Sequence, residues 1–177
     1  MEKYHLPTIK RLSGQQNVSI SGIWNRTRPK AEKLARDFEL PKVYEDLQEV
    51  IDDPEVSCLA VAVNSQAVGQ ILRTLAVREL PLICEKPPGA DAMEARELAD
   101  LITSTNVVAF NRRYMPLNQR FKELVGREQI EFVECSFYRR RRDVEKFITE
   151  TGIHGINLLE FLFGEIAKVE TERWQVP

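Results

Sequence analysis

The sequence has little of what a disulfide-stapled, metal-clustered, membrane-spanning or polycationic protein requires. Its 177 residues include three cysteines and two histidines, so we expect neither a disulfide framework nor a metal site. The longest strongly apolar run, Cys58 to Val63, has six residues, whereas a membrane-spanning helix needs about 20. The net charge of −2 gives no positive field to attract nucleic acid or an anionic membrane. We therefore expect a globular chain that binds neither.

The cysteines also indicate the redox environment in which the protein is expected to occur. Cys58, Cys84 and Cys135 each lie in an apolar, strand-like stretch, and none belongs to a Cys-x-x-Cys pair. We expect all three to be buried, reduced thiols, which fits a cytoplasmic location.

The first 110 residues alternate strand-like and helix-like segments. β-branched and apolar runs predict strands over Val18–Trp24, Cys58–Val63, Leu80–Cys84 and Val107–Phe110. Apolar spacing and capping residues predict helices over Met1–Leu12, Thr27–Phe38 and Tyr44–Ile51, a further helix with Ser65 as its N-cap, and a helix that begins at the Asp91–Glu94 capping box. Such alternation is typical of parallel βαβ units. We therefore predict an α/β fold with a Rossmann-like, doubly wound parallel sheet.

Polar clusters follow four of the predicted strands. They are Asn25-Arg26-Thr27, Asn64-Ser65, Glu85-Lys86 and Asn111-Arg112-Arg113. In an open parallel sheet, ligands bind beyond the carboxyl ends of the strands. These clusters are therefore the candidate binding residues.

The pattern changes in the last third of the chain, and we assign residues 1–110 to one domain and 111–177 to another. Strands over Ile130–Tyr138 and Ile166–Val176, with a helix over Gly152–Phe163 between them, predict the start of an α+β domain with a mostly antiparallel sheet. The run Arg139–Arg142 is expected to be a solvated edge or turn. Its alternatives are a site for an acidic or phosphorylated substrate and an oligomer interface.

Two positions carry side chains suited to proton transfer. Lys86, at the end of a buried strand, can donate a proton or hydrogen bond to a substrate oxygen; the alternative is a solvated loop lysine. His154 and Asn157 are three residues apart and share one helix face. An imidazole suits proton transfer near neutral pH, and the alternative is a core histidine.

Taken in order, these segments resemble the Gfo/Idh/MocA family (glucose–fructose oxidoreductase, inositol dehydrogenase and rhizopine catabolism). The resemblance covers essentially the whole chain. Its motifs are Glu85-Lys86-Pro87, Phe110-Asn111-Arg112-Arg113-Tyr114-x-Pro116, Gly152-x-His154-x-x-Asn157 and Gly164-Glu165-Ile166. The chain departs from the family at Asn157, where the family has Asp, so a hydrogen-bonding side chain remains but its charge is lost.

The resemblance implies a nicotinamide-dependent oxidoreductase that transfers hydride to or from a sugar, polyol or related compound. His154 would take or give the hydroxyl proton, and Asn157 would contact the substrate. Lys86 would hydrogen-bond the same oxygen or orient the substrate and the nicotinamide. It also implies that residues 1–110 bind NAD(P) and that the second domain supports a homo-oligomer. The alternative is a non-catalytic dinucleotide-binding or regulatory protein, because one fold can serve either role.

The cofactor expected is NADP, with NAD as the alternative. An acid at the end of the second strand of such a domain would favour NAD, and this chain has Asn25-Arg26-Thr27-Arg28 there. Guanidinium groups suit a phosphate. The expected cofactor contacts are Asn25, Arg26, Thr27, Arg28, Asn64, Ser65, Glu85, Lys86, Asn111 and Arg113.

The Gly-x-Gly-x-x-Gly turn of dinucleotide-binding folds is not in the sequence. In the family, a strand and this turn precede the helix that Met1–Leu12 resembles. We therefore expect a chain truncated at both ends, with a gap in the sheet beside Val18–Trp24 and weak or no NADP binding by the chain alone. The hypothesis that a short apolar strand and a Gly-rich turn are encoded upstream of Met1 can be tested by reading the upstream DNA.

Overall fold

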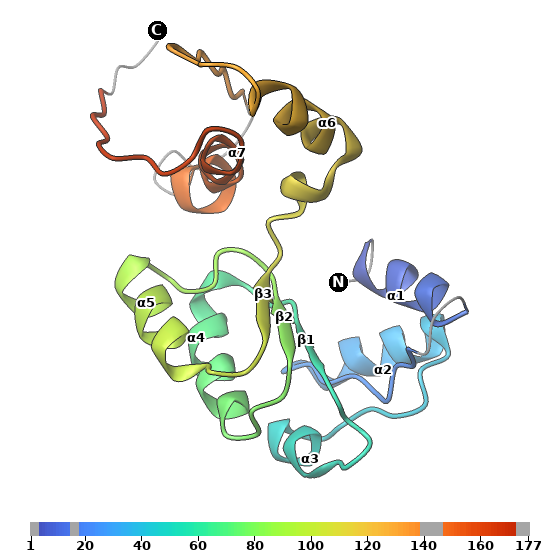
Figure 1. Cartoon of the computed structure of the whole chain (residues 1–177). Helices are drawn as coiled ribbons and strands as arrows, with labels where there is room; N and C mark the ends of the chain where they lie inside the picture. The colour runs from blue at the N-terminus through green and yellow to red at the C-terminus, as the bar shows by residue number, and fades with distance from the viewer. Residues whose placement is uncertain (1–3, 15–17, 139–146, 173–177) are drawn as a thin grey trace, which may run out of the picture. The chain divides into compact units, whose positions relative to one another are not determined.

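The computed structural model describes residues 4–14, 18–138 and 147–172 and divides into two units, Met1–Val108 and Ala109–Pro177 (Figure 1). Each unit is described by itself. The run Arg139–Arg142 lies outside the described residues. So do the first three residues of the predicted helix Met1–Leu12 and the last four of the predicted strand Ile166–Val176. No helix of the described ranges is both long and apolar enough to cross a membrane.

Unit 1 is built on a parallel sheet. Its strands are β1 (Leu59–Val61), β2 (Leu82–Cys84) and β3 (Asn106–Val108), in the order β1-β2-β3. Both pairings are parallel, and each connection contains a helix. The prediction of parallel βαβ units is confirmed for this part of the chain.

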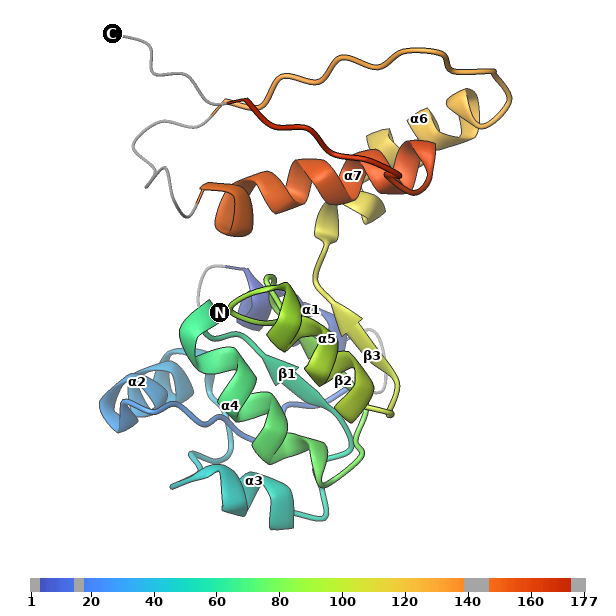
Figure 2. The ribbon, with the colours of Figure 1, turned by 90° about the vertical axis from the view of Figure 1, so that its left-hand side faces the viewer.

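Five helices accompany the sheet. They are α1 (His5–Ser13), α2 (Arg28–Phe38), α3 (Leu47–Asp52), α4 (Ser65–Ala76) and α5 (Ala92–Leu101). Figure 2 shows α4 and α5 side by side over one face of the strands.

The core lies between that face and the two helices. Leu59 and Val61 of β1 and Leu82 of β2 are buried, whereas the alternate residues Ala60 and Ile83 are exposed. This alternation follows from the two-residue period of a strand. The buried strand residues belong to one apolar cluster with Val68, Leu72 and Leu75 of α4 and Leu98 of α5.

Helix starts are fixed by capping side chains, which corrects two predicted boundaries. Asp46 accepts a hydrogen bond from the Glu49 amide, so α3 begins at Leu47 rather than near Tyr44. The N-cap of α4 is Asn64, not Ser65, because the Asn64 side chain accepts from the Ala67 amide. Asp91 caps α5 as predicted.

The predicted strand Val18–Trp24 is wrong in its extent. It is reduced to a single parallel bridge between Ile23 and Val43. A strand is defined by its partners, and no strand among the described residues pairs with the other edge of this segment.

In residues 109–138 and 147–172 of unit 2, the regular secondary structure is helical. It contains the 3₁₀-helix η1 (Asn111–Tyr114), α6 (Pro116–Val125), the π-helical turn η2 (Ile148–Gly152) and α7 (Ile153–Phe163). Phe121 of α6 meets Phe163 of α7 edge to face, with ring centroids 6.5 Å apart. The predicted helix over Gly152–Phe163 is confirmed.

The predicted strand Ile130–Tyr138 is wrong, and so is the described part of Ile166–Val176. Neither segment forms regular structure in residues 109–138 and 147–172, and Phe132 and Tyr138 are exposed. Their alternating pattern suits a sheet, but a strand without partners is not stable on its own.

The cysteines are only partly as expected. Cys84 is buried, and burial raises the pKa of its thiol, with a smaller contribution from the neighbouring Glu85 carboxylate. Cys58 and Cys135 are exposed. Cys135 lies in the stretch 126–136, in which every residue is exposed, so the apolar pattern around it is not covered by other elements.

Tyr44 provides a pH-dependent test of unit 1. The residue is 4% exposed, and its phenol donates a hydrogen bond to Asp53 Oδ2 at 2.9 Å. Burial and this hydrogen bond raise the pKa of Tyr44 to about 12, whereas an unfolded tyrosine titrates near pH ~10. The neutral phenol therefore contributes stability that is complete below pH ~10 and is lost as the pH rises toward about 12.

We expect a phenolate absorbance step near pH 12 that Tyr44→Phe removes. The difference in unfolding free energy between the native chain and Tyr44→Phe should shrink across that interval, as measured by urea unfolding. A difference that stays constant with pH would contradict this account.

Candidate functional site

Glu85 and Lys86 stand where β2 ends. The Glu85 amide donates to the Val61 carbonyl at 2.9 Å, which ties the residue to the end of β1. The Glu85 carboxylate accepts from the Lys86 amide at 3.2 Å, and the Lys86–Pro87 peptide bond is cis. Lys86 is half-buried. The strand end and this corner therefore hold a carboxylate and an ammonium group next to each other.

His5 is a member of this corner that the sequence did not reveal. Its Nε2 lies 2.5 Å from Glu85 Oε1, although the two residues are 80 positions apart. The helical spacing of α1 explains why His5 is on a helix, but no local pattern indicates its partner. The contact places the first turn of α1 at the carboxyl end of the sheet.

The cluster after the Val18–Trp24 segment is organised by its own side chains. Asn25 Oδ1 accepts from the Thr27 amide at 2.8 Å, which forms an Asx turn before α2. Arg28 pairs with Glu32 at 2.8 Å and also with Glu45. Arg26 is exposed and makes no hydrogen bond or ion pair with any residue that the structure describes. The two arginines therefore differ, because the Arg28 guanidinium is engaged by carboxylates and the Arg26 guanidinium has no partner among the described residues.

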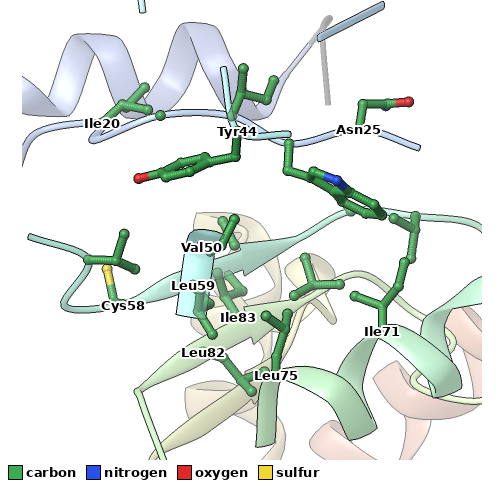
Figure 3. A pocket seen from close by; sticks show the side chains of 18 of the residues that line it. Ile20, Asn25, Tyr44, Val50, Cys58, Leu59, Ile71, Leu75, Leu82 and Ile83 are labelled. Atoms are coloured by element: carbon green, nitrogen blue, oxygen red, sulfur yellow. The ribbon is translucent and has the colours of Figure 1, made fainter. Parts of the chain in front are cut away.

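Two of the predicted clusters meet at one cavity of about 720 Å³ (Figure 3). Asn25, Arg26 and Thr27 line it from one side, and Asn64 lines it from the end of β1. Asn64 and Ser65 form the start of α4, so backbone amides of a helix N-terminus lie there as well. Arg28, Ser65, Glu85 and Lys86 are not among the residues that line this cavity.

Unit 2 brings together Arg113 and Asn157. Arg113 Nε donates to Asn157 Oδ1 at 2.6 Å, and the Arg113 guanidinium also lies over the ring of Phe161, 5.7 Å from its centroid. Asn157 is buried and Asn111 is exposed. The bond joins η1 to α7. It could not be predicted from the spacing of residues in the sequence, because the two partners are 44 positions apart.

His154 lies one helical turn before Asn157 on α7. The residue is half-buried, and its Nδ1 atom is shielded from solvent. Glycines at 152 and 155 flank it, and the ring of Phe137 lies within van der Waals reach of a Cβ at Gly155. Lys86 belongs to unit 1 and His154 to unit 2.

Comparison with known families supports a dinucleotide-binding fold. The sequence model of a family described as "Oxidoreductase family, NAD-binding Rossmann fold" matches residues 1–112, more than half of the chain. The Rossmann-like class predicted from the sequence is thereby confirmed.

Several of the similar curated proteins are named as dehydrogenases. Trans-1,2-dihydrobenzene-1,2-diol dehydrogenase from Mus musculus is 28% identical over 169 residues, which are 86% of this chain and 49% of that protein. Inositol 2-dehydrogenase 2 from Mycolicibacterium vanbaalenii is 28% identical over 176 residues, 92% of this chain and 50% of that protein. The chain thus spans about half the length of the curated relatives it matches.

Solved structures agree on the fold. The myo-inositol dehydrogenase of Lactobacillus casei, in complex with NAD(H) and myo-inositol, matches with a TM-score of 0.76 and 23% identity, over 89% of this chain and 50% of that one. The dehydrogenase MviM of Clostridium difficile matches with a TM-score of 0.79 and 18% identity, over 99% and 57%.

The Arg113–Asn157 bond predicts a measurable coupling. Asn157→Leu should lower the free energy of unfolding by about 1–3 kcal/mol, because it leaves the Arg113 guanidinium without its acceptor. Asn157→Asp should retain the bond, since a carboxylate accepts from arginine more strongly than an amide does.

Urea unfolding of the single variants, Arg113→Met and the double variant Arg113→Met/Asn157→Leu would measure the coupling in a double-mutant cycle. Purely additive losses would show that the bond contributes nothing.

Proposed function

The chain belongs to the Gfo/Idh/MocA family of oxidoreductases, and from this premise we propose that it carries the cofactor-binding and catalytic side chains of an NAD(P)-dependent oxidoreductase. Its substrates would be sugars, polyols or related hydroxyl and carbonyl compounds. The observation that carries the proposal is the Glu85–Lys86 corner, which lies at the end of a buried parallel strand inside the region that the family model matches. Ligands of open α/β sheets bind beyond such strand ends.

The residues at this edge fit the groups of a dinucleotide. The Arg26 guanidinium is exposed and has no described partner, so it can take a 2′-phosphate, whereas Arg28 is engaged by Glu32 and Glu45. The remaining proposed contacts from unit 1 are Asn25, Thr27, Asn64, Ser65, Glu85 and Lys86, and those from unit 2 are Asn111 and Arg113. We therefore favour NADP over NAD and assign the discrimination to Arg26.

When bound, the nicotinamide ring supplies the hydride chemistry. The chain's own part is to move and hold a proton. In alcohol oxidation, the His154 imidazole would accept the hydroxyl proton, and the Lys86 ammonium would donate a hydrogen bond to a substrate oxygen. In the reverse direction, His154 would return the proton.

Asn157 would orient the substrate. Its Oδ1 already accepts from Arg113, while its Nδ2 makes no hydrogen bond with the residues that the structure describes. The amide N–H groups can therefore donate to a substrate hydroxyl. An aspartate, which the family has at this position, would lack that donor. Asn157 can therefore donate a hydrogen bond to an acceptor oxygen of the substrate, whereas an aspartate could only accept one.

The assignment to Arg26 can be tested by equilibrium binding. Although the chain alone is expected to bind NADPH weakly, that binding should be tighter than the binding of NADH. Arg26→Ala should weaken NADPH binding by about 10- to 100-fold, because a charge-assisted hydrogen bond is worth about 1.5–3 kcal/mol. NADH binding should change little. Reduced-nicotinamide fluorescence would measure both affinities.

Arg36→Ala is the matched control, because Arg36 is an exposed arginine in the last turn of α2, the helix that follows Arg26. Equal affinities of the native chain for NADPH and NADH would contradict the NADP assignment. A preference for NADPH that persists in Arg26→Ala would contradict the role of Arg26.

The catalytic assignment is tested by turnover. With NADP and a panel of polyols and sugars, His154→Gln and Lys86→Met should each lower the rate of NADP reduction by about 10²- to 10⁴-fold, the usual contribution of a general acid or base. Lys33→Met, an exposed lysine of α2, serves as the control and should leave the rate unchanged.

The pH profile of the active chain should lose its imidazole limb in His154→Gln. Cofactor binding without turnover on any member of the panel would instead favour a non-catalytic dinucleotide-binding protein.

A further inference from the structure

His5 and Glu85 form a charge-assisted hydrogen bond at the carboxyl end of the sheet, and the roles proposed for Lys86 and His154 do not use it. The imidazole Nε2 lies 2.5 Å from Glu85 Oε1, and the two side chains are 33% and 32% exposed. An ionised carboxylate can only accept hydrogen bonds, so the imidazole donates from Nε2. Among the residues that the structure describes, His5 makes no other hydrogen bond or ion pair.

The backbone on each side of this contact is anchored. Beside His5, Leu6 is buried and fixes the first turn of α1. The main-chain amide of Glu85 donates to the Val61 carbonyl at 2.9 Å, which holds the backbone at the end of β2. Rotation of the Glu85 side chain is therefore the freedom that the imidazole restricts.

The second carboxylate oxygen of Glu85 is occupied by the main chain of its neighbour. The Lys86 amide donates to Oε2 at 3.2 Å, whereas the imidazole of His5 takes Oε1. The Lys86 ammonium group takes part in neither contact. His5 thus holds the carboxylate in an orientation in which it engages the backbone of Lys86 and not the end of its side chain.

Without His5, the ammonium of Lys86 would be the competing partner for this carboxylate. The residues are neighbours, the chain bends at Lys86, and both side chains are half-buried. Opposite charges attract more strongly there than at a fully exposed surface, because water and salt screen them less. An ammonium that pairs with Glu85 has less of its charge and fewer of its N–H donors to offer to a substrate oxygen.

We propose that His5 is a positioning residue of the oxidoreductase, because its hydrogen bond keeps the Glu85 carboxylate from swinging onto the Lys86 ammonium. The inference rests on the function proposed above for Lys86. In this role His5 acts through Glu85 and gives nothing to the substrate itself.

Amine labelling of Lys86 measures this effect without cofactor or substrate. A lysine amine reacts with trace acetic anhydride only when it is neutral, and pairing with a carboxylate favours the charged form. His5→Phe keeps an aromatic ring but removes the donor. We therefore expect Lys86 to be labelled about two- to fivefold more slowly in this variant, the effect of one partly exposed ion pair. Peptide mass spectrometry would measure the rate, with Lys33, an exposed lysine of α2, as the internal standard.

Three further variants test whether the effect passes through Glu85. His5→Gln should keep the native labelling rate, because its side-chain amide can still donate to the carboxylate. In His5→Phe/Glu85→Gln no carboxylate remains to capture the ammonium, so the rate at Lys86 should return at least to the native value. Lys10→Met is the matched control, because it removes the ion pair with Glu39 and loosens α1 without touching Glu85. Its labelling should stay native.

Unchanged labelling of Lys86 in His5→Phe would overturn the proposal. Slow labelling in the double variant would show that the effect bypasses Glu85, and slow labelling in Lys10→Met would show that any loosening of α1 suffices. Either result would also overturn it.

Turnover gives a second readout. With the panel of polyols and sugars, His5→Phe should lower kcat by about 10- to 100-fold through misplacement of the Lys86 ammonium, with a smaller change in KM, and His5→Gln should recover most of the loss. A loss confined to KM would overturn the positioning role. If no compound of the panel is oxidised by the native chain, the oxidoreductase assignment fails, and the labelling rates still decide whether His5 keeps Glu85 from Lys86.

Discussion

Parallel pairing of β1, β2 and β3 is the constraint on which the rest of unit 1 depends. Because the strands run the same way, every segment that leaves a strand starts at one edge of the sheet. The bond from the Glu85 amide to the Val61 carbonyl fixes that edge at atomic level. The apolar cluster beneath α4 and α5 holds the strands in register. Residues as distant in sequence as His5 and Glu85 therefore meet.

Several of the candidate site residues already make hydrogen bonds that stabilise the fold. Asn64 caps α4, Asn25 closes the turn before α2, and Asn157 accepts from Arg113. Each amide uses one part of its hydrogen-bonding capacity inside the chain and can offer the other part to a ligand. Substituting one of them would disturb fold and site together. Arg26, by contrast, makes no hydrogen bond or ion pair with the residues that the structure describes.

The sequence was a good guide wherever one segment determined its own structure. The buried runs at β1 and β2 and the Asp91 cap of α5 were predictable, because a continuous apolar run or a capping side chain acts locally. The strand predicted over Ile130–Tyr138 failed, because a strand depends on its neighbours. Among the site residues, the clusters after the strands follow from parallel topology. The engagement of Arg28 by Glu45 and of Glu85 by His5 depends on packing between distant segments, and no local pattern could indicate it.

The shortened strand over Val18–Trp24 and the cavity that it lines are two aspects of one physical situation. The segment has β-branched residues and pairs at Ile23, yet its other edge faces an apolar space in which no strand of the described residues lies. A ligand pocket usually offers a few convergent polar groups on an apolar surface. In this cavity those polar groups include the side chains of Asn25 and Asn64, and each of them also caps or closes the turn before a helix. The local structure that starts α2 and α4 therefore also sets where these polar groups lie along the cavity.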